Sequence, residues 1–132
     1  MSTTVSTTVL NVLASSYLGS GSPATLYAAF FTGATDGLTG GTEAAGGNYS
    51  RTAVTNNTTN FPAASGGVVT LGVNFSGPRS SAAWGTVNCI RFYTASSGGT
   101  LVLGSLLTPT VTVDATGITI TIEAGSLTFT VA

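Results

Sequence analysis

Charge is what this chain has least of. Only 5% of its 132 residues are charged, compared with about a quarter in an average soluble protein. It has no lysine, and its only cations are three arginines, so it lacks the basic residues that displace counterions from phosphates. We therefore expect no nucleic-acid partner. The apolar content of 42% is ordinary and the net charge is only -1, a balance that favours folding over disorder.

Histidine is absent, which removes the commonest general base and the commonest metal ligand. The four carboxylates are spread along the chain, at Asp36, Glu43, Asp114 and Glu123. A glycosidase-like pair would require two of them to face each other across a cleft, as Asp114 and Glu123 could if their strands paired. Solvated strand ends are the alternative interpretation of these two. We expect a protein that is not an enzyme and holds no cofactor.

The glycine-rich segment around Asp36 and Glu43 raises the question of a calcium site, because such a loop can add backbone carbonyls to two carboxylates. The dense alternation of Asp and Asn found in calcium loops is missing. We expect this loop to lie in solvent or on a partner, with no metal bound.

Cysteine and long apolar runs are also scarce. Cys89 is the only cysteine, so no internal disulfide can form, and assembly in a reducing cytoplasm is expected. The longest apolar run extends from Leu26 to Phe31, far short of the roughly 20 residues of a membrane span. We expect neither membrane insertion nor a secretion signal.

Short extended segments separated by Gly, Pro, Ser and Asn fill the chain from residue 24 onwards. Ile118, Ile120 and Ile122 alternate with polar residues, as in a half-buried strand, and a turn at Ala124-Gly125 separates them from the next strand. The expected strands lie within 24–33, 49–55, 66–75, 82–94, 101–107, 110–113, 118–122 and 127–131. They predict an all-β, single-domain β-sandwich or jelly-roll-like fold of about eight short strands over residues 23–132.

Residues 1–22 form a separate N-terminal helix or arm in this prediction. Val5, Val9, Leu13 and Tyr17 recur every four residues, which is helical spacing, but the many threonines around them are poor helix formers. An arm without regular structure is therefore the alternative. In either case we expect these four residues to form an interface with a partner.

The segment 84–93 is apolar on both faces, which predicts a strand covered on both sides. One face carries Trp84, Ile90 and Phe92, and the other carries Val87, Cys89 and Tyr93. Arg91 within it needs a carboxylate or carbonyl partner. A salt bridge to a neighbouring subunit would make Arg91 a fifth interface residue, whereas a strand-end position would let its side chain reach solvent. We expect Trp84 in the core rather than on a sugar-binding surface.

The polar faces of the predicted strands carry threonine rather than Lys or Glu. Such faces can be buried against another protein without the desolvation cost of a charge, and interface cores are depleted of charge. The composition therefore favours a domain that works within a larger assembly.

Four blocks, in the order "PATLYAAFFTG", "GGNYSRTAVT", "AAWGTVNCIRFYTASSGGTLVLGSL" and "AGSLTFTV", resemble a family of small bacteriophage virion structural proteins. Members of that family are labelled as capsid decoration (cement), tail fibre or minor tail proteins. The resemblance covers most of the chain after the N-terminal segment, and implies a non-enzymatic virion component with a compact β fold, assembled in the host cytoplasm.

Three hypotheses about function follow. The first is a capsid decoration protein that binds the major capsid protein on the outer capsid surface as a homo-oligomer, with a trimer favoured. The second is a tail-associated component, namely a fibre knob, adaptor or minor tail protein. The third is a carbohydrate-binding adhesin that stacks sugars on Trp84, Tyr49 or Tyr93.

Overall fold

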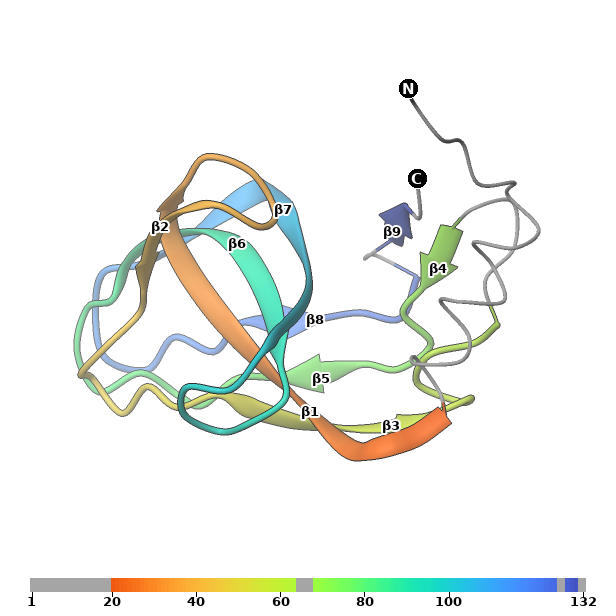
Figure 1. The fold of residues 1–132 in the computed structure, drawn as a ribbon. Helices are drawn as coiled ribbons and strands as arrows, with labels where there is room; N and C mark the ends of the chain where they lie inside the picture. Colours follow the sequence, from red (N-terminus) through yellow and green to blue (C-terminus); the bar gives the residue numbers. More distant parts are fainter. Residues whose placement is uncertain (1–19, 64–67, 126–127, 131–132) are drawn as a thin grey trace, which may run out of the picture.

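The computed structural model describes residues 20–63, 68–125 and 128–130, and these residues contain strands and no helix (Figure 1). The prediction of an all-β fold is confirmed. Residues 1–19 of the predicted N-terminal helix or arm, with Val5, Val9, Leu13 and Tyr17, lie outside the described residues, whereas residues 20–22 belong to strand β1. The strands are β1 (Ser20–Ala34), β2 (Gly40–Glu43), β3 (Thr52–Asn57), β4 (Val68–Thr70), β5 (Phe75–Ser76), β6 (Gly85–Tyr93), β7 (Leu101–Val113), β8 (Thr121–Ile122) and β9 (Thr128–Thr130).

The long strands form one antiparallel sheet in the order β2-β1-β6-β7, and β3 also pairs with β1. β2 and β3 occupy successive stretches of the same edge of β1. They pair with its second and first halves, respectively. β1 is therefore central, as its two apolar faces predict. In Figure 1, β1, β6 and β7 cross the molecule side by side, with β2 near one end.

The two faces of β1 serve two separate clusters of apolar side chains. Leu26, Ala28 and Phe30 are fully buried in the main core, whereas Ala29 and Phe31 point to the opposite face and pack with Cys89. Successive residues of a strand point to opposite faces, so an uninterrupted apolar run is what a strand covered on both sides requires. We call the second cluster, formed by Ala29, Phe31 and Cys89, the outer cluster.

Two short antiparallel ladders, β4 with β9 and β5 with β8, lie on the main-core side of the large sheet. Phe92 of β6 joins the layers, because its ring makes edge-to-face contacts with Phe75 of β5 and with Phe61. The alternation predicted around residue 120 is confirmed, since Ile120 and Ile122 are buried and their threonine neighbours are exposed. A turn at Ala124 and Gly125 follows β8, as predicted, but β8 and β9 pair with different partners.

One face assignment in β6 is wrong. Val87 belongs to the main core with Ile90 and Phe92, and not to the face of Cys89. The cause is a β-bulge at Asn88, which adds one residue between the Val87 and Cys89 pairings and reverses the alternation. The Asn88 side chain compensates for the interrupted ladder, since its amide donates to the Ala34 carbonyl and its carbonyl accepts from the Ala34 N–H, both at 3.0 Å.

The predicted segments 101–107 and 110–113 are one strand, β7, with an irregularity inside it. Its pairing with β6 moves from Leu106 opposite Cys89 to Val111 opposite Val87, so the residues between them bulge out of the ladder. The predicted hairpin turn before β7 is confirmed: Thr94 and Thr100 close it by backbone hydrogen bonding, and Gly98 and Gly99 both have positive φ. The described strands number nine, because the predicted segment 66–75 gives two strands, β4 and β5, and the glycine-rich loop contains β2, which together outweigh the merger into β7.

Candidate functional site

The outer cluster is covered by the loop of residues 35–39 between β1 and β2. This loop lies directly on β7, where Gly37 and Gly104 face each other so closely that a Cβ on Gly104 would overlap the Gly37 carbonyl. Gly104 is the strand partner of Arg91, so the absence of a side chain there makes room for both the loop and the arginine. Glycine in a strand is typical of such close backbone approaches.

Arg91 of β6 binds the loop of residues 35–39 through hydrogen bonds. It is only 4% exposed, and its guanidinium donates hydrogen bonds to the carbonyl oxygens of Asp36, Gly37, Thr39 and Gly40, at 2.9 to 3.3 Å. The partners of Arg91 are therefore carbonyls of its own chain, in the loop of residues 35–39 and at Gly40, and the strand-end position in solvent is wrong. The guanidinium also lies over the Phe31 ring at 4.2 Å from its centroid, a cation–π contact.

The Asp36 carboxylate shapes the same loop from its other end. It accepts hydrogen bonds of 2.8 Å from the backbone N–H groups of Leu38 and Thr39. These bonds favour the ionised form, so the pKa of Asp36 lies below its usual value, with a smaller contribution from the Arg91 charge. Asp36 thus acts as an internal brace of the loop. Nothing in its contacts resembles the shared ligation of a cation by Asp36 and Glu43.

A second arginine ties three segments together beside this loop. Arg51 binds the Glu43 carboxylate in bidentate fashion, with both N–O distances at 2.9 Å. The remaining guanidinium nitrogen, Nη1, donates hydrogen bonds to the carbonyls of Ala95 and Gly98 in the β6–β7 turn. The Arg51 side chain is 7% exposed and lies 4.0 Å from the centroid of the Tyr93 ring. The pair therefore connects β2, the start of β3 and the turn before β7.

Tyr49 completes this group. Its hydroxyl donates to Glu43 at 2.7 Å and accepts from the backbone N–H of Phe30 at 3.1 Å. The hydrogen bond from Arg51, followed by that from Tyr49, lowers the pKa of Glu43. Burial, together with the adjacent Glu43 carboxylate, raises the pKa of Tyr49 above its usual range. Both groups therefore keep their ordinary protonation states near neutral pH, as structural groups do.

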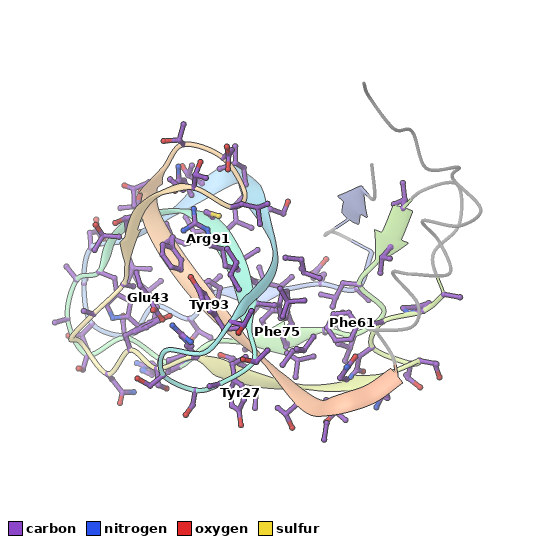
Figure 2. All side chains as sticks on the ribbon, in the orientation of Figure 1. Tyr27, Glu43, Phe61, Phe75, Arg91 and Tyr93 are labelled. Atoms are coloured by element: carbon purple, nitrogen blue, oxygen red, sulfur yellow. The ribbon has the colours of Figure 1, made fainter. Side chains whose placement is uncertain are left out.

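The two arginines are linked through two aromatic rings. Phe31 and Tyr93 stack with centroids 6.3 Å apart, Arg91 covers the first ring and Arg51 lies over the second. We call Arg91, Phe31, Tyr93 and Arg51 the outer-face row. In Figure 2, Arg91, Tyr93 and Glu43 lie toward β2, whereas Phe75 and Phe61 lie toward β5 and β4. The row holds the loops on the outside of the sheet and serves as a scaffold.

Replacing Glu43 with glutamine is expected to lower the free energy of unfolding by about 2 kcal/mol at pH 7, because Arg51 then stays buried without its anion. Since the pKa of Glu43 is lowered in the folded state, its contribution is complete above the unfolded-state pKa and is lost as the pH falls through the folded-state value. The difference between wild type and Glu43→Gln should therefore shrink between about pH 5 and pH 3. Urea titrations across this range would measure it.

Asp114→Asn is the matched control, because it removes the same charge from an exposed position. We expect this variant to differ little from wild type at any of these pH values. An equal pH response in the two variants would contradict the role assigned to the Glu43–Arg51 pair.

The aromatic residues considered as sugar platforms are used in packing. Trp84 is 8% exposed and belongs to the main core, as expected. Its indole N–H donates to the Gly47 carbonyl at 3.0 Å, and its ring contacts Tyr49 edge to face. Tyr49 is also committed to Glu43, and Tyr93 lies under Arg51. The structure therefore gives the adhesin hypothesis no support.

Other reactive groups are equally occupied or isolated. The Cys89 thiol is buried, lies 3.6 Å from the Gly37 carbonyl oxygen, and has its pKa raised by burial, so it is not an activated nucleophile. Within the described ranges, no three His, Cys, Asp or Glu residues come together as metal ligands. Asp114 and Glu123 are both exposed, and β7 and β8 are not paired strands of one described sheet.

No helix in the described residues is long and apolar enough to cross a membrane.

Sequence reasoning missed the Glu43–Arg51 pair and the carbonyl cage around Arg91. All seven charged residues of the chain lie in the described ranges, and three of them, Glu43, Arg51 and Arg91, are wholly or partly buried on this side of the sheet. The usable signal was Arg91 within an apolar strand, which did imply a carbonyl or carboxylate partner. Nothing in the spacing of Glu43 and Arg51 indicated that they meet.

These features define an all-β protein whose buried charges hold its own loops and whose rings and thiol are engaged in packing. That is the construction of a structural protein. A family model described as "Podophage GP4 fiber I protein gp80" matches residues 1–130, and the chain therefore belongs to this family. The resemblance to small phage virion proteins is thus confirmed, and the chain is a phage virion structural protein. The family indicates a non-enzymatic role. No curated protein matches the chain.

Proposed function

We propose that this protein is a fibre-associated component of the phage tail that works by binding other virion proteins and copies of itself. The family description, which names a fibre protein, supports this location over the capsid. The observation that carries the contact role is the nature of the surface: only Asp36, Arg79, Asp114 and Glu123 are exposed charged residues, and all seven charges of the chain are described. An exterior so poor in charge suits burial in an assembly.

The absence of sequence repeats narrows the choice of fibre part that this chain could form. A long fibre shaft is usually built from sequence repeats or a heptad stalk, and the chain shows neither. We therefore propose a small knob or adaptor rather than a shaft, present as a homo-oligomer. A trimer is the favoured state, because several weak contacts then add up to strong attachment.

A capsid decoration protein bound to the major capsid protein is the second candidate. The lack of a repeat or heptad stalk in the sequence supports it, since a decoration protein needs only a broad contact surface. It would require many copies on the outer capsid surface, whereas a fibre component would be present in few.

Copy number in purified particles would test both candidates. Quantitative mass spectrometry of this protein against the major capsid protein should give a handful of copies per particle if it belongs to the tail. A ratio near one would place it on the shell and overturn the fibre proposal in favour of decoration. Its absence from purified particles would contradict both. Antibody labelling in electron micrographs would independently show where on the particle the protein lies.

A further inference from the structure

β7 is an edge strand, and part of its length lacks the usual protection. Within residues 20–63, 68–125 and 128–130, it pairs only with β6, and it ends the order β2-β1-β6-β7. An edge strand presents alternate backbone N–H and C=O groups to whatever lies beside it, and proteins commonly guard such edges with lysine, proline or a bulge. The stretch Leu103–Leu106 contains none of these features, whereas an irregularity at Val102 precedes it and the bulge with Pro109 follows it.

The other edges of the large sheet are less suitable for adding a strand. β2 is short and begins with two glycines that have positive φ. β3 is partly covered by its own chain, because the amide of Asn60 donates to the Thr55 carbonyl at 2.8 Å. The stretch Leu103–Leu106 of β7 is therefore the regular part of this edge to which a strand could be added.

The side chains beside this edge are apolar and exposed. Leu106 is 44% exposed and Leu38 is 54% exposed, and these are the exposed large hydrophobic residues of the described chain. Leu106 is paired with Cys89 on the outer face, and Leu38 follows Gly37, which packs on Gly104 of β7. Both leucines thus flank the same stretch of edge. A strand added there would cover apolar side chains as well as backbone groups.

Residues 1–19 match this edge in chemistry and in length. Residues 2–19 carry no charge and are rich in Val and Thr, the residues that favour strands. Val5, Val9, Leu13 and Tyr17 are all odd-numbered, so they would share one face of an extended chain as well as one face of a helix. Fully extended, the segment spans about 60 Å, far more than the edge stretch of β7 needs.

The direction of β1 favours the segment of a second copy over that of the same copy. β1 and β7 both run antiparallel to β6, and β1 starts at Ser20, before its pairing with β6 begins at Tyr27. Ser20, to which the N-terminal segment is joined, therefore lies at the end of the sheet remote from Leu106, whose partner Cys89 lies opposite Phe31, about 35 Å along β1. The N-terminal segment of the same copy would start from this remote end. To reach its own edge it would have to reverse direction.

We propose that the N-terminal segment of one copy adds as a strand to the β7 edge, at Leu103–Leu106, of a second copy. The contact is heterologous, because a segment of one copy meets a different surface of the next; such contacts form a ring when the rotation between copies closes and an open filament when it does not. The inference goes beyond the proposed function and is independent of where the protein sits on the particle.

The mass of the purified full-length protein gives the first test, by sedimentation equilibrium. We expect an oligomer for the wild type and a single-chain mass for a variant lacking residues 2–18, which retains every described strand. Leu106→Lys should raise the concentration for half-assembly at least about tenfold, while Leu106→Thr, its uncharged control, should change it far less. A wild-type monomer at all concentrations, or an unchanged oligomer after the deletion, would overturn the proposal.

Disulfide trapping identifies the occupant. Val9→Cys and Leu106→Cys chains, refolded together and oxidised, should yield disulfide-linked mixed dimers, with Val5→Cys and Leu13→Cys covering other registers. Cys89 is buried and serves as a constant background. Linked dimers of Leu106→Cys alone would show that two β7 edges pair instead. A chain that carries both Val9→Cys and Leu106→Cys tests the other possibility, because links formed only within single chains would show that the segment covers its own edge. Either result would refute the proposal.

Discussion

Arg91→Met is expected to lower the free energy of unfolding by about 4 kcal/mol, although the substitution keeps an apolar side chain of similar length. The reason is that the Arg91 guanidinium satisfies the carbonyls of Asp36, Gly37, Thr39 and Gly40 from a position that is 4% exposed. Without the guanidinium, these carbonyls lose a charged hydrogen-bond donor. A carbonyl that is left without a partner then costs its desolvation free energy. Urea unfolding followed by tryptophan fluorescence would measure the change.

Arg79→Met is the matched control, because Arg79 is an exposed arginine on the same domain. We expect its effect to stay within about 0.5 kcal/mol. If both variants lost the same stability, general loss of positive charge, rather than the carbonyl cage, would be the cause. Amide hydrogen exchange offers a local readout, since Arg91→Met should speed exchange in the loop at residues 35–39 more than in β3.

Phe92→Ala is expected to lower the free energy of unfolding by about 4 kcal/mol, the effect of leaving a large cavity in a packed core. Phe92 is fully buried on β6 and meets Phe61 and Phe75 edge to face. The cavity would lie where the large sheet meets the short β5–β8 ladder. We therefore expect β5 and β8 to lose hydrogen-exchange protection first.

Leu106→Ala is the comparison for this substitution, because it also shortens an apolar side chain of the large sheet but at an exposed position. Its effect on the stability of the single chain should be below about 1 kcal/mol. A similar loss for the two variants would contradict the view that one continuous core joins the large sheet to the short ladders.

Local pattern was sufficient for most of the strands. The uninterrupted apolar run from Leu26 to Phe31 correctly indicated a central strand covered on both faces, and the alternation around Ile120 correctly indicated a half-buried one. These signals work because the direction of a side chain in a strand depends only on its position in the chain. Trp84 was likewise assigned to the core from its place at the start of an apolar strand.

The face of Val87 could not be obtained in this way. The bulge at Asn88 depends on the pairing of β6 with β1, and on the two hydrogen bonds that Asn88 makes to Ala34, which is 54 residues away in the chain. A single extra residue reverses every later side chain of a strand. Sequence periodicity alone does not contain that information.

For the candidate site too, some features follow from the sequence and others only from the tertiary structure. The sequence by itself determined that the fold is all-β, that charge is scarce, and that Arg91 requires a carbonyl or carboxylate partner, since these follow from composition and alternation. Only the tertiary structure decided that Arg91 binds the carbonyls of loop 35–39 and Gly40, that Glu43 meets Arg51, and that β7 is left at the edge. These are pairings between distant segments, and their geometry depends on how the strands are ordered in the sheet, which local residue preferences do not specify.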